Sequence, residues 1–208
     1  MVFVKAVKVW YNAHRIFLIG RKNVNTLSLV HQQLEQFIRP GNFVIDATAG
    51  NGRDTVFLCG LVGTEGKVLA FDIQQQAVDN TQKRLSEAGW EQTGSVVLDS
   101  HANMAQYAQP GTVDCIVFNL GWLPGGDHAI FTHADSTIAA IEAGLELLRD
   151  GGLMCVSIYY GGASGYEERD TLLEYVKTID PDRYTVLVTQ FANRAGDPPI
   201  PVLIWKAT

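Results

Sequence analysis

The first residues that could do chemistry are two carboxylates with a glycine-rich turn between them. The segment 44–55 begins as an apolar run, passes through Asp46 and becomes the turn Gly50-Asn51-Gly52. A second apolar run ends in Asp72. A strand that enters a glycine turn and then a helix brings backbone N–H groups to one point, and a carboxylate after the next strand suits ribose hydroxyls. This stretch is therefore expected to bind an adenosine-type cofactor.

The spacing of the glycine turn indicates which cofactor. Residues 50–55 read Gly-x-Gly-x-x-Thr, without the third glycine that lets a helix pack beneath a pyrophosphate. S-adenosylmethionine (SAM) has no phosphate, so it does not need that glycine. Its methionine part suits Asn51 and Asp54, its ribose suits Asp72 and Gln74, and its adenine suits Asp99-Ser100-His101 after the third apolar run. The predicted SAM-binding residues are Asp46, Gly50, Asn51, Gly52, Asp54, Asp72, Ile73, Gln74, Ser100, His101 and Asn119.

A second candidate set follows the fourth predicted strand, with the order Asn119-Leu120-Gly121-Trp122. Many amine-directed methyltransferases carry Asn/Asp-Pro-Pro-aromatic here, and this chain keeps the amide and the aromatic residue without the prolines. An amide accepts a hydrogen bond from a nitrogen, and an aromatic ring stacks on a base. A protonated amine must lose a proton before it attacks, and Asp127 or His128 could accept it. The candidate catalytic residues are Asn119, Trp122, Asp127 and His128.

The alternative for this loop is a purely structural role, in which Trp122 closes the edge of the core and Asp127 caps a turn. Further along, the segments after the fifth strand and between the last two strands form the expected substrate rim. The predicted substrate-binding residues are Trp122, Tyr160, Asn193 and Arg194. Arg194 suits a phosphate contact, although a single exposed arginine often has no partner.

These residues must be positioned by the strands and helices that alternate along the chain. Five apolar runs, at 43–46, 67–72, 95–98, 113–119 and 153–159, are each followed by a helical pattern. Asp150-Gly151-Gly152 is expected to stop the helix 136–148, and Gly161–Gly165 is expected to be a loop before a helix from about Tyr166.

The last two predicted strands, 184–191 and 201–206, have no helix between them and should pair as a hairpin. A dinucleotide-binding domain ends in a parallel strand, whereas a class I methyltransferase sheet ends in an antiparallel hairpin. The predicted fold is therefore α/β and Rossmann-like, of the class I methyltransferase type. It has a seven-stranded, mostly parallel sheet with a C-terminal antiparallel hairpin and helices on both faces.

Composition limits the remaining possibilities. The 208 residues, 47% of them hydrophobic, suit one globular domain, and no apolar run reaches the roughly 18 residues that span a bilayer. The N-terminus lacks the apolar core of a signal peptide. Three widely spaced cysteines are expected to be buried free thiols in a reducing cytosol, and no metal-ligand spacing appears. We therefore expect a cytoplasmic protein without a membrane partner or metal.

Charge is unevenly distributed. Residues 1–40 carry six basic residues and one acidic residue, and the rest carries ten basic and twenty-one acidic residues. A basic end on an acidic body can face a polyanion, or it can simply be a solvated surface. The predicted division is a basic N-terminal extension, 1–24, and a SAM-dependent methyltransferase domain, 25–208.

Several segments together resemble the bacterial putative rRNA methylase family. They are Asp-Ala-Thr-Ala-Gly-Asn-Gly-Arg-Asp-Thr (46–55), Phe-Asp-Ile-Gln (71–74), Asp-Ser-His-Ala-Asn (99–103), Asn-Leu-Gly-Trp-Leu-Pro-Gly-Gly-Asp (119–127) and a Pro-Pro pair near the end. The resemblance covers roughly residues 25–206. Members of this family are assigned as enzymes that methylate the amine of 5-aminomethyl-(2-thio)uridine at the tRNA wobble position.

The resemblance implies roles for individual residues. Asn51, Asp54, Asp72, Gln74, Ser100 and His101 would contact the cofactor, and Asn119, Trp122 and Asp127 would border the target amine and base. Two features depart from the family: the segment after the fifth strand lacks a histidine, and residues 1–24 are additional.

The expected function is SAM-dependent N-methylation of RNA, with tRNA as partner. The alternatives are an rRNA or small-molecule methyltransferase, a nicotinamide-dependent oxidoreductase and a non-catalytic SAM-binding subunit. Whether the protein forms a homodimer stays open.

Overall fold

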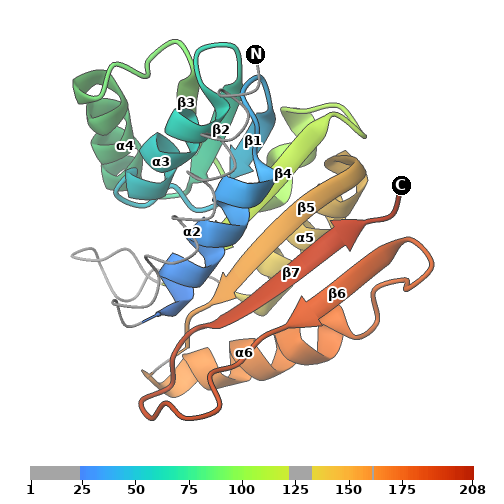
Figure 1. Cartoon of the computed structure of the whole chain (residues 1–208). Coiled ribbons are helices and arrows are strands. Elements are labelled where there is room, and N and C mark those ends of the chain that lie inside the picture. Colours follow the sequence, from blue (N-terminus) through green and yellow to red (C-terminus); the bar gives the residue numbers. More distant parts are fainter. Residues whose placement is uncertain (1–23, 122–132, 161) are drawn as a thin grey trace, which may run out of the picture.

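A computed structural model of the chain describes residues 24–121, 133–160 and 162–208, with the backbone alone at 162–164. Its centre is a seven-stranded sheet with the order β3-β2-β1-β4-β5-β7-β6 (Figure 1). The strands are β1 (Phe43–Asp46), β2 (Lys67–Asp72), β3 (Gly94–Leu98), β4 (Val113–Asn119), β5 (Leu148–Ile158), β6 (Tyr184–Val188) and β7 (Ile200–Lys206).

The first five strands run parallel, and β7 runs antiparallel to both β5 and β6. This confirms the predicted fold class, including the C-terminal hairpin. The predicted N-terminal extension lies almost entirely outside the described residues, so the division at residue 24 stays a prediction.

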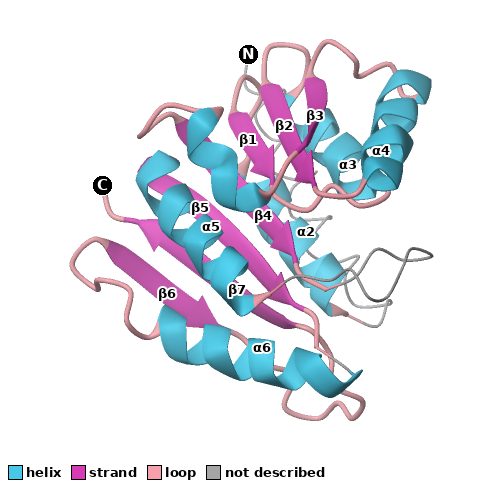
Figure 2. Ribbon diagram, turned by 180° about the vertical axis from the view of Figure 1, so that it is seen from behind, coloured by secondary structure: helices cyan, strands magenta, loops and turns pink. Residues whose placement is uncertain are grey.

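Helices cover both faces of the sheet, as Figures 1 and 2 show from opposite sides. They are α2 (Thr26–Phe37), α3 (Arg53–Val62), α4 (Gln75–Glu87), the 3₁₀ helix η2 (His101–Gln106), α5 (Ala134–Leu147) and α6 (Gly162–Val176). On one face, α2, α3 and α4 share a buried cluster with the sheet, in which Leu34, Leu58 and Leu85 take part. On the other face, α5, α6 and η2 share a second buried cluster with the sheet, to which Ile141, Leu172 and Met104 belong.

Burial on both faces explains why the middle strands could be recognised from the sequence. In β4, all residues except Asp114 and Asn119 are buried, which gives a continuous apolar run rather than an alternating one. At the start of α2, the side chain of Asn25 accepts a hydrogen bond from the N–H of Ser28 (2.8 Å), and the N–H of Asn25 donates to the Ser28 hydroxyl (2.9 Å). This capping box fixes where the helix begins.

The helix predicted to stop before Asp150-Gly151-Gly152 does end there, at Leu147, but the next strand begins at Leu148 rather than at 153. Residues Asp150-Gly151-Gly152 lie inside β5 rather than in a turn, where the pairing with β4 shifts register between Val113 and Cys115. Leu148 pairs with Val113 and Leu153 with Cys115, so the register of these two described strands gives residues 149–152 no partner in β4. Gly151 has a φ of 70°, so the conformational freedom of glycine is used within β5. Residues 162–165, expected in a loop, form the first turn of α6. The strand predicted to reach residue 191 ends at Val188.

The three cysteines are free and buried, as predicted. Burial raises the pKa of Cys59 to about 12, so this thiol stays protonated and unreactive. Among the described residues, no helix has both the length and the apolar character needed to cross a membrane.

Candidate active site

The candidate site lies at the edge of the sheet where the parallel strands end (Figure 2). Strand β1 has β2 on one side and β4 on the other, so the order of the strands reverses at β1. In an open α/β sheet, ligands bind in the crevice that forms at such a reversal. The predicted residues after β1, β2, β3 and β4 therefore meet along one edge.

The glycine turn after β1 packs directly against α4. Gly50 and Gly52 have positive φ angles of 53° and 72°. A Cβ atom on Gly52 would lie 2.7 Å from the Cα of Thr81, so there is no room for a side chain. The Thr81 hydroxyl donates to the carbonyl of Gly50 (3.2 Å). The turn is thereby held in place, with the N-terminus of α3 directly behind it.

Asp72 joins the end of β2 to this turn. Its Oδ2 accepts a hydrogen bond from the N–H of Gly50 (2.9 Å), and its Oδ1 accepts one from the N–H of Gln74 (3.0 Å). Each carboxylate oxygen has a second lone pair, so both can still accept a hydrogen bond from a ligand hydroxyl. In the same turn, the side-chain oxygen of Asn51 accepts a hydrogen bond from the amide of Asn80 in α4 (3.0 Å).

The residues after β3 form a compact hydrogen-bonded group. Asp99 accepts hydrogen bonds from the Asn103 amide (2.8 Å), the Tyr107 hydroxyl (2.7 Å) and the N–H of Ser100 (2.7 Å), and these bonds lower the pKa of its carboxyl. Close by, Ile73 and Leu98 are exposed at 57% and 50%. Exposed aliphatic side chains at a strand end provide an apolar surface for a flat ring.

His101 is held in place by a hydrogen bond to the backbone. Its Nδ1 lies 3.1 Å from the carbonyl oxygen of Ala47, and burial lowers its pKa. Because a carbonyl only accepts, Nδ1 carries the proton of the neutral ring, and Nε2 is left as an acceptor.

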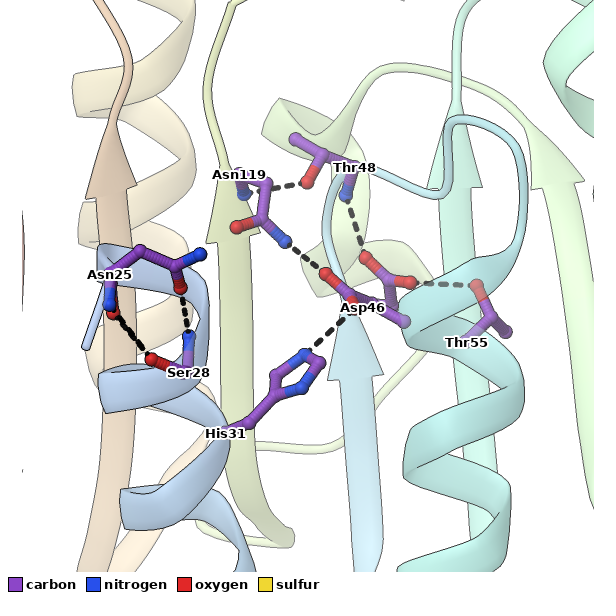
Figure 3. Close-up of polar contacts among 8 residues, drawn as sticks. Asn25, Ser28, His31, Asp46, Thr48, Thr55 and Asn119 are labelled. Atoms are coloured by element: carbon purple, nitrogen blue, oxygen red, sulfur yellow. Dashed lines mark hydrogen bonds and ion pairs between the residues drawn. The ribbon is translucent and has the colours of Figure 1, made fainter. Parts of the chain in front are cut away.

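A shared carboxylate connects the two halves of the site. Oδ2 of Asp54 lies 2.7 Å from the amide nitrogen of Asn119, and its Oδ1 lies 2.9 Å from Nε2 of His31. In Figure 3, dashed lines run from the labelled side chains of His31, on α2, and Asn119, at the end of β4, to the carboxylate that carries no label, which these hydrogen bonds identify as that of Asp54. The ring of His31 also stacks on Phe57 at a centroid distance of 4.0 Å.

This contact fixes the orientation of the Asn119 amide. A carboxylate oxygen only accepts, so the Nδ2 group of Asn119 must face Asp54. The backbone N–H of Asn119 is also held, because it donates to the hydroxyl of Thr48 (2.7 Å). The side-chain oxygen of Asn119 is therefore directed away from Asp54 and has no hydrogen bond among those of the described residues.

Asp46 supports this arrangement from the core. It is fully buried, and it accepts hydrogen bonds from the Thr55 hydroxyl (2.7 Å) and from the N–H of Thr48 (3.2 Å), as Figure 3 shows. Burial raises the pKa of Asp46 to about 7. Asp46 has no exposed surface, so its hydrogen bonds position Thr48 and Thr55 rather than a ligand directly. A direct contact of Asp46 with the cofactor stays a prediction.

The remaining predicted residues fall into two groups. Trp122, Asp127 and His128 lie outside the described residues. Tyr160 and Arg194 line a separate cleft further along the same edge, and Asn193 is exposed near it.

Sequence reasoning missed His31. The only signal was a polar ring on an otherwise apolar helix face, between the buried residues Val30 and Leu34. Its partner Asp54 is 23 positions away, so the contact depends on the packing of α2 beside α3.

Comparisons with known proteins identify relatives of this chain. A profile of the family described as "Putative rRNA methylase" matches residues 68–205. The chain is 34% identical over 198 residues to the protein named tRNA (mnm(5)s(2)U34)-methyltransferase, chloroplastic, from Arabidopsis thaliana. The match covers 91% of this chain and 70% of that relative.

Two solved structures are similar over nearly their whole length. A putative rRNA-methylase from Clostridium thermocellum is 43% identical with a TM-score of 0.86, covering 89% of this chain and 99% of that one. A putative methyltransferase from Streptococcus mutans, in complex with SAH, is 34% identical with a TM-score of 0.80 and the same coverage.

Proposed function

The chain belongs to the family described as "Putative rRNA methylase", and from this membership we propose that it methylates RNA at the aminomethyl nitrogen of a tRNA wobble uridine. The protein is a SAM-dependent methyltransferase, as its family and its similarity to a structure in complex with SAH, the product of methyl transfer from SAM, indicate. The relative from Arabidopsis supports the choice of acceptor, since its name specifies U34 of tRNA.

The residues at the sheet edge fit SAM. Backbone N–H groups at the start of α3 suit its carboxylate, and the carboxylate of Asp72 suits its ribose hydroxyls. The exposed side chains of Ile73 and Leu98 suit its adenine. The other predicted side-chain contacts stay part of this proposal: Asn51, Asp54, Gln74, Ser100, His101 and Asn119. When bound, SAM supplies a methyl group on a positively charged sulfur, which is already a good electrophile.

The single observation that carries the choice of an amine acceptor is the fixed amide of Asn119. Because Asp54 holds its nitrogen, Asn119 presents an oxygen that can accept a hydrogen bond from an N–H group. An amine has such a donor and also a lone pair to attack with. The hydrogen bond would direct the N–H toward Asn119 and leave the lone pair free for the methyl group.

In the proposed reaction, the nitrogen forms a bond to the methyl carbon while the bond from that carbon to sulfur breaks. The amine must be neutral to attack, so one proton leaves for each methyl group transferred. Asp127 and His128 remain the proposed acceptors of that proton, and Trp122 remains the proposed stacking surface for the base. Most of the catalysis is expected from holding the nitrogen in line with the methyl group.

The test is methyl transfer by the purified protein. It is incubated with SAM and with tRNA from cells that accumulate 5-aminomethyl-(2-thio)uridine, and the nucleosides are analysed by mass spectrometry. We expect that nucleoside to decrease as its 5-methylaminomethyl form appears, and a deletion strain to show the opposite change. Normal levels of the methylated form in the deletion strain, with no other enzyme for this step, would reject the proposal.

A parallel reaction with rRNA tests the acceptor that the family description names. Methylation of rRNA but not of tRNA would favour rRNA as the substrate.

A further inference from the structure

A cleft of about 480 Å³ lies between α6 and the segment that joins β6 to β7. It opens at the same sheet edge as the candidate active site. The strand register places Asn119 beside Ser157 and Ser157 beside Pro201. Neighbouring strands lie about 4.8 Å apart, so this row places Pro201 roughly 10 Å from Asn119. Ile200, next to Pro201, forms part of the cleft wall. A nucleotide next to the one whose amine lies at Asn119 could therefore reach the cleft.

The walls of the cleft carry arginines stacked on aromatic rings. The guanidinium carbon of Arg169 lies 4.8 Å from the ring centroid of Tyr160 and 5.0 Å from that of Tyr166. The guanidinium carbon of Arg194 lies 4.5 Å from the centroid of Phe191. Aromatic rings and arginine planes are the surfaces on which unstacked RNA bases stack.

The two arginines differ in their charge partners. Arg169 is paired with Asp170 at 2.6 Å, so its charge is largely neutralised within the protein. Arg194 is exposed, and none of the ion pairs among the described residues involves it. Arg194 is therefore the arginine of the cleft whose charge is available to a phosphate.

The loop that forms the far wall is held from two sides. Asp197 has a φ of 50°, the only positive φ of a residue other than glycine in the described part of the chain. Its Oδ2 accepts a hydrogen bond from the hydroxyl of Tyr166 (2.6 Å). The carbonyl of Pro199 accepts one from the hydroxyl of Thr26 in α2 (2.7 Å). A wall held in this way loses little conformational freedom when a ligand binds.

We infer that this cleft binds a single unstacked nucleotide of the RNA, next to the one that is methylated. Phe191 and Tyr160 would provide stacking surfaces and Arg194 a phosphate contact. The volume suits one nucleotide, since ligand pockets typically measure about 300–1,000 Å³. Asp170 and Asp197 balance the two arginines, so stacking rather than net charge should supply most of the affinity. The inference rests on the proposed function, since it requires an RNA substrate.

The experiment measures RNA binding rather than turnover. The probe is a fluorescently labelled anticodon stem-loop RNA with 5-aminomethyluridine at the wobble position, titrated with the full-length protein saturated with SAH. Phe191→Leu keeps an apolar side chain but removes the aromatic face, and Phe191→Tyr restores that face. Arg194→Gln removes the charge. Arg183→Gln is the control for removing an exposed, stacked arginine away from the cleft. The guanidinium carbon of Arg183 lies 5.3 Å from the ring centroid of Tyr184 at the opposite end of β6, and Arg183 is paired with Glu146 at 3.0 Å.

We expect Phe191→Leu to weaken RNA binding about tenfold, the size expected for the loss of one base–aromatic stack, and Phe191→Tyr to restore it. Arg194→Gln should weaken binding. It should also make the plot of log K against log salt concentration less steep by about 0.7, the slope that one phosphate contact contributes on a single strand. Arg183→Gln should bind as the wild type does. All four variants should keep the wild-type affinity for SAH, which shows that they are folded.

Two failures can be told apart. If the wild-type protein binds the RNA and both Phe191→Leu and Arg194→Gln bind it equally well, the inference is wrong and the proposed function stands. If the wild-type protein binds SAH but neither binds nor methylates the RNA, the proposed function fails, and the cleft assignment is rejected with it.

Discussion

The amide nitrogen of Asn119 lies 2.7 Å from a carboxylate oxygen of Asp54, although the two residues are 65 positions apart in the chain. Asp54 belongs to the first turn of α3, behind the glycine turn, and Asn119 ends β4. One hydrogen bond therefore connects the part of the site proposed for the methyl donor to the part proposed for the acceptor.

Replacing Asn119 tests this connection. Asn119→Ala should lower kcat/KM for tRNA methylation about 10- to 150-fold, the range that corresponds to a hydrogen bond of about 1.5–3 kcal/mol to a charged group. Asn119→Asp should lower it at least as much, because two carboxylates would then face each other. Labelled methyl transfer to undermodified tRNA gives the rates, and calorimetry with SAH shows whether the donor site survives. Wild-type kcat/KM in Asn119→Ala would remove Asn119 from the proposed mechanism.

His31 is predicted to act through Asp54 as a positioning residue. His31→Ala removes the hydrogen bond to Oδ1 and frees the carboxylate to rotate, so kcat should fall about tenfold, corresponding to ~1.4 kcal/mol. The KM for tRNA should change little. His31→Gln retains an N–H donor and should recover much of the activity. Gln36→Ala, an exposed position on the same helix, is the control. Equal kcat values for His31→Ala and Gln36→Ala would show that His31 only fills space.

Gly52 is predicted to tolerate no side chain. Gly52→Ala would place a Cβ atom 2.7 Å from the Cα of Thr81 in a backbone region that L residues rarely adopt. We expect a loss of about 1–3 kcal/mol in the free energy of unfolding and weaker SAH binding. Gly60→Ala is the control within α3, the helix that Gly52 precedes, since its added Cβ meets no atom within 4 Å. That variant should gain about 1 kcal/mol. Urea unfolding with and without SAH measures both effects, and equal stabilities for the two variants would contradict the prediction.

Asp46 should make stability depend on pH. Its folded pKa of about 7 lies above the ordinary value of 3.8, because burial disfavours the charged form. Its contribution to stability is therefore fully present below about pH 4 and is lost as the pH rises toward 7. Asp46→Asn cannot ionise and can hydrogen bond to both threonines. The free energy of unfolding of this variant should rise relative to the wild type between pH 4 and 8, by up to about 4 kcal/mol at ~1.4 kcal/mol per pKa unit. Parallel pH profiles for the two proteins would contradict a raised pKa.

The sequence predicted the fold well where burial is symmetrical. Strands β1, β2 and β4 begin and end where the apolar runs do, because both faces of the sheet are covered there. The prediction failed at the start of β5, which lies at Leu148 rather than at 153, and at residues 162–165, which begin α6 rather than form a loop.

The site, like the fold, could be predicted only in part. The acid at the end of β2 and the glycines after β1 could be predicted because each follows its own strand directly. The contact of His31 with Asp54 could not, since it depends on how α2 packs against the sheet. The orientation of the Asn119 amide could not be predicted either, because only the neighbouring carboxylate determines it.

The reversal of strand order at β1 has a practical consequence for protein engineering. Apart from Asn119, the residues proposed to bind the methyl donor fall between positions 46 and 101, and those proposed to meet the RNA fall at 119 and beyond. The 3₁₀ helix η2 and the turn after it separate the two groups. A chimaera of two family members joined between residues 107 and 112 should therefore inherit its donor site from one parent and its choice of RNA from the other. Its design has one constraint: Asp54 of the first parent must still meet the asparagine of the second.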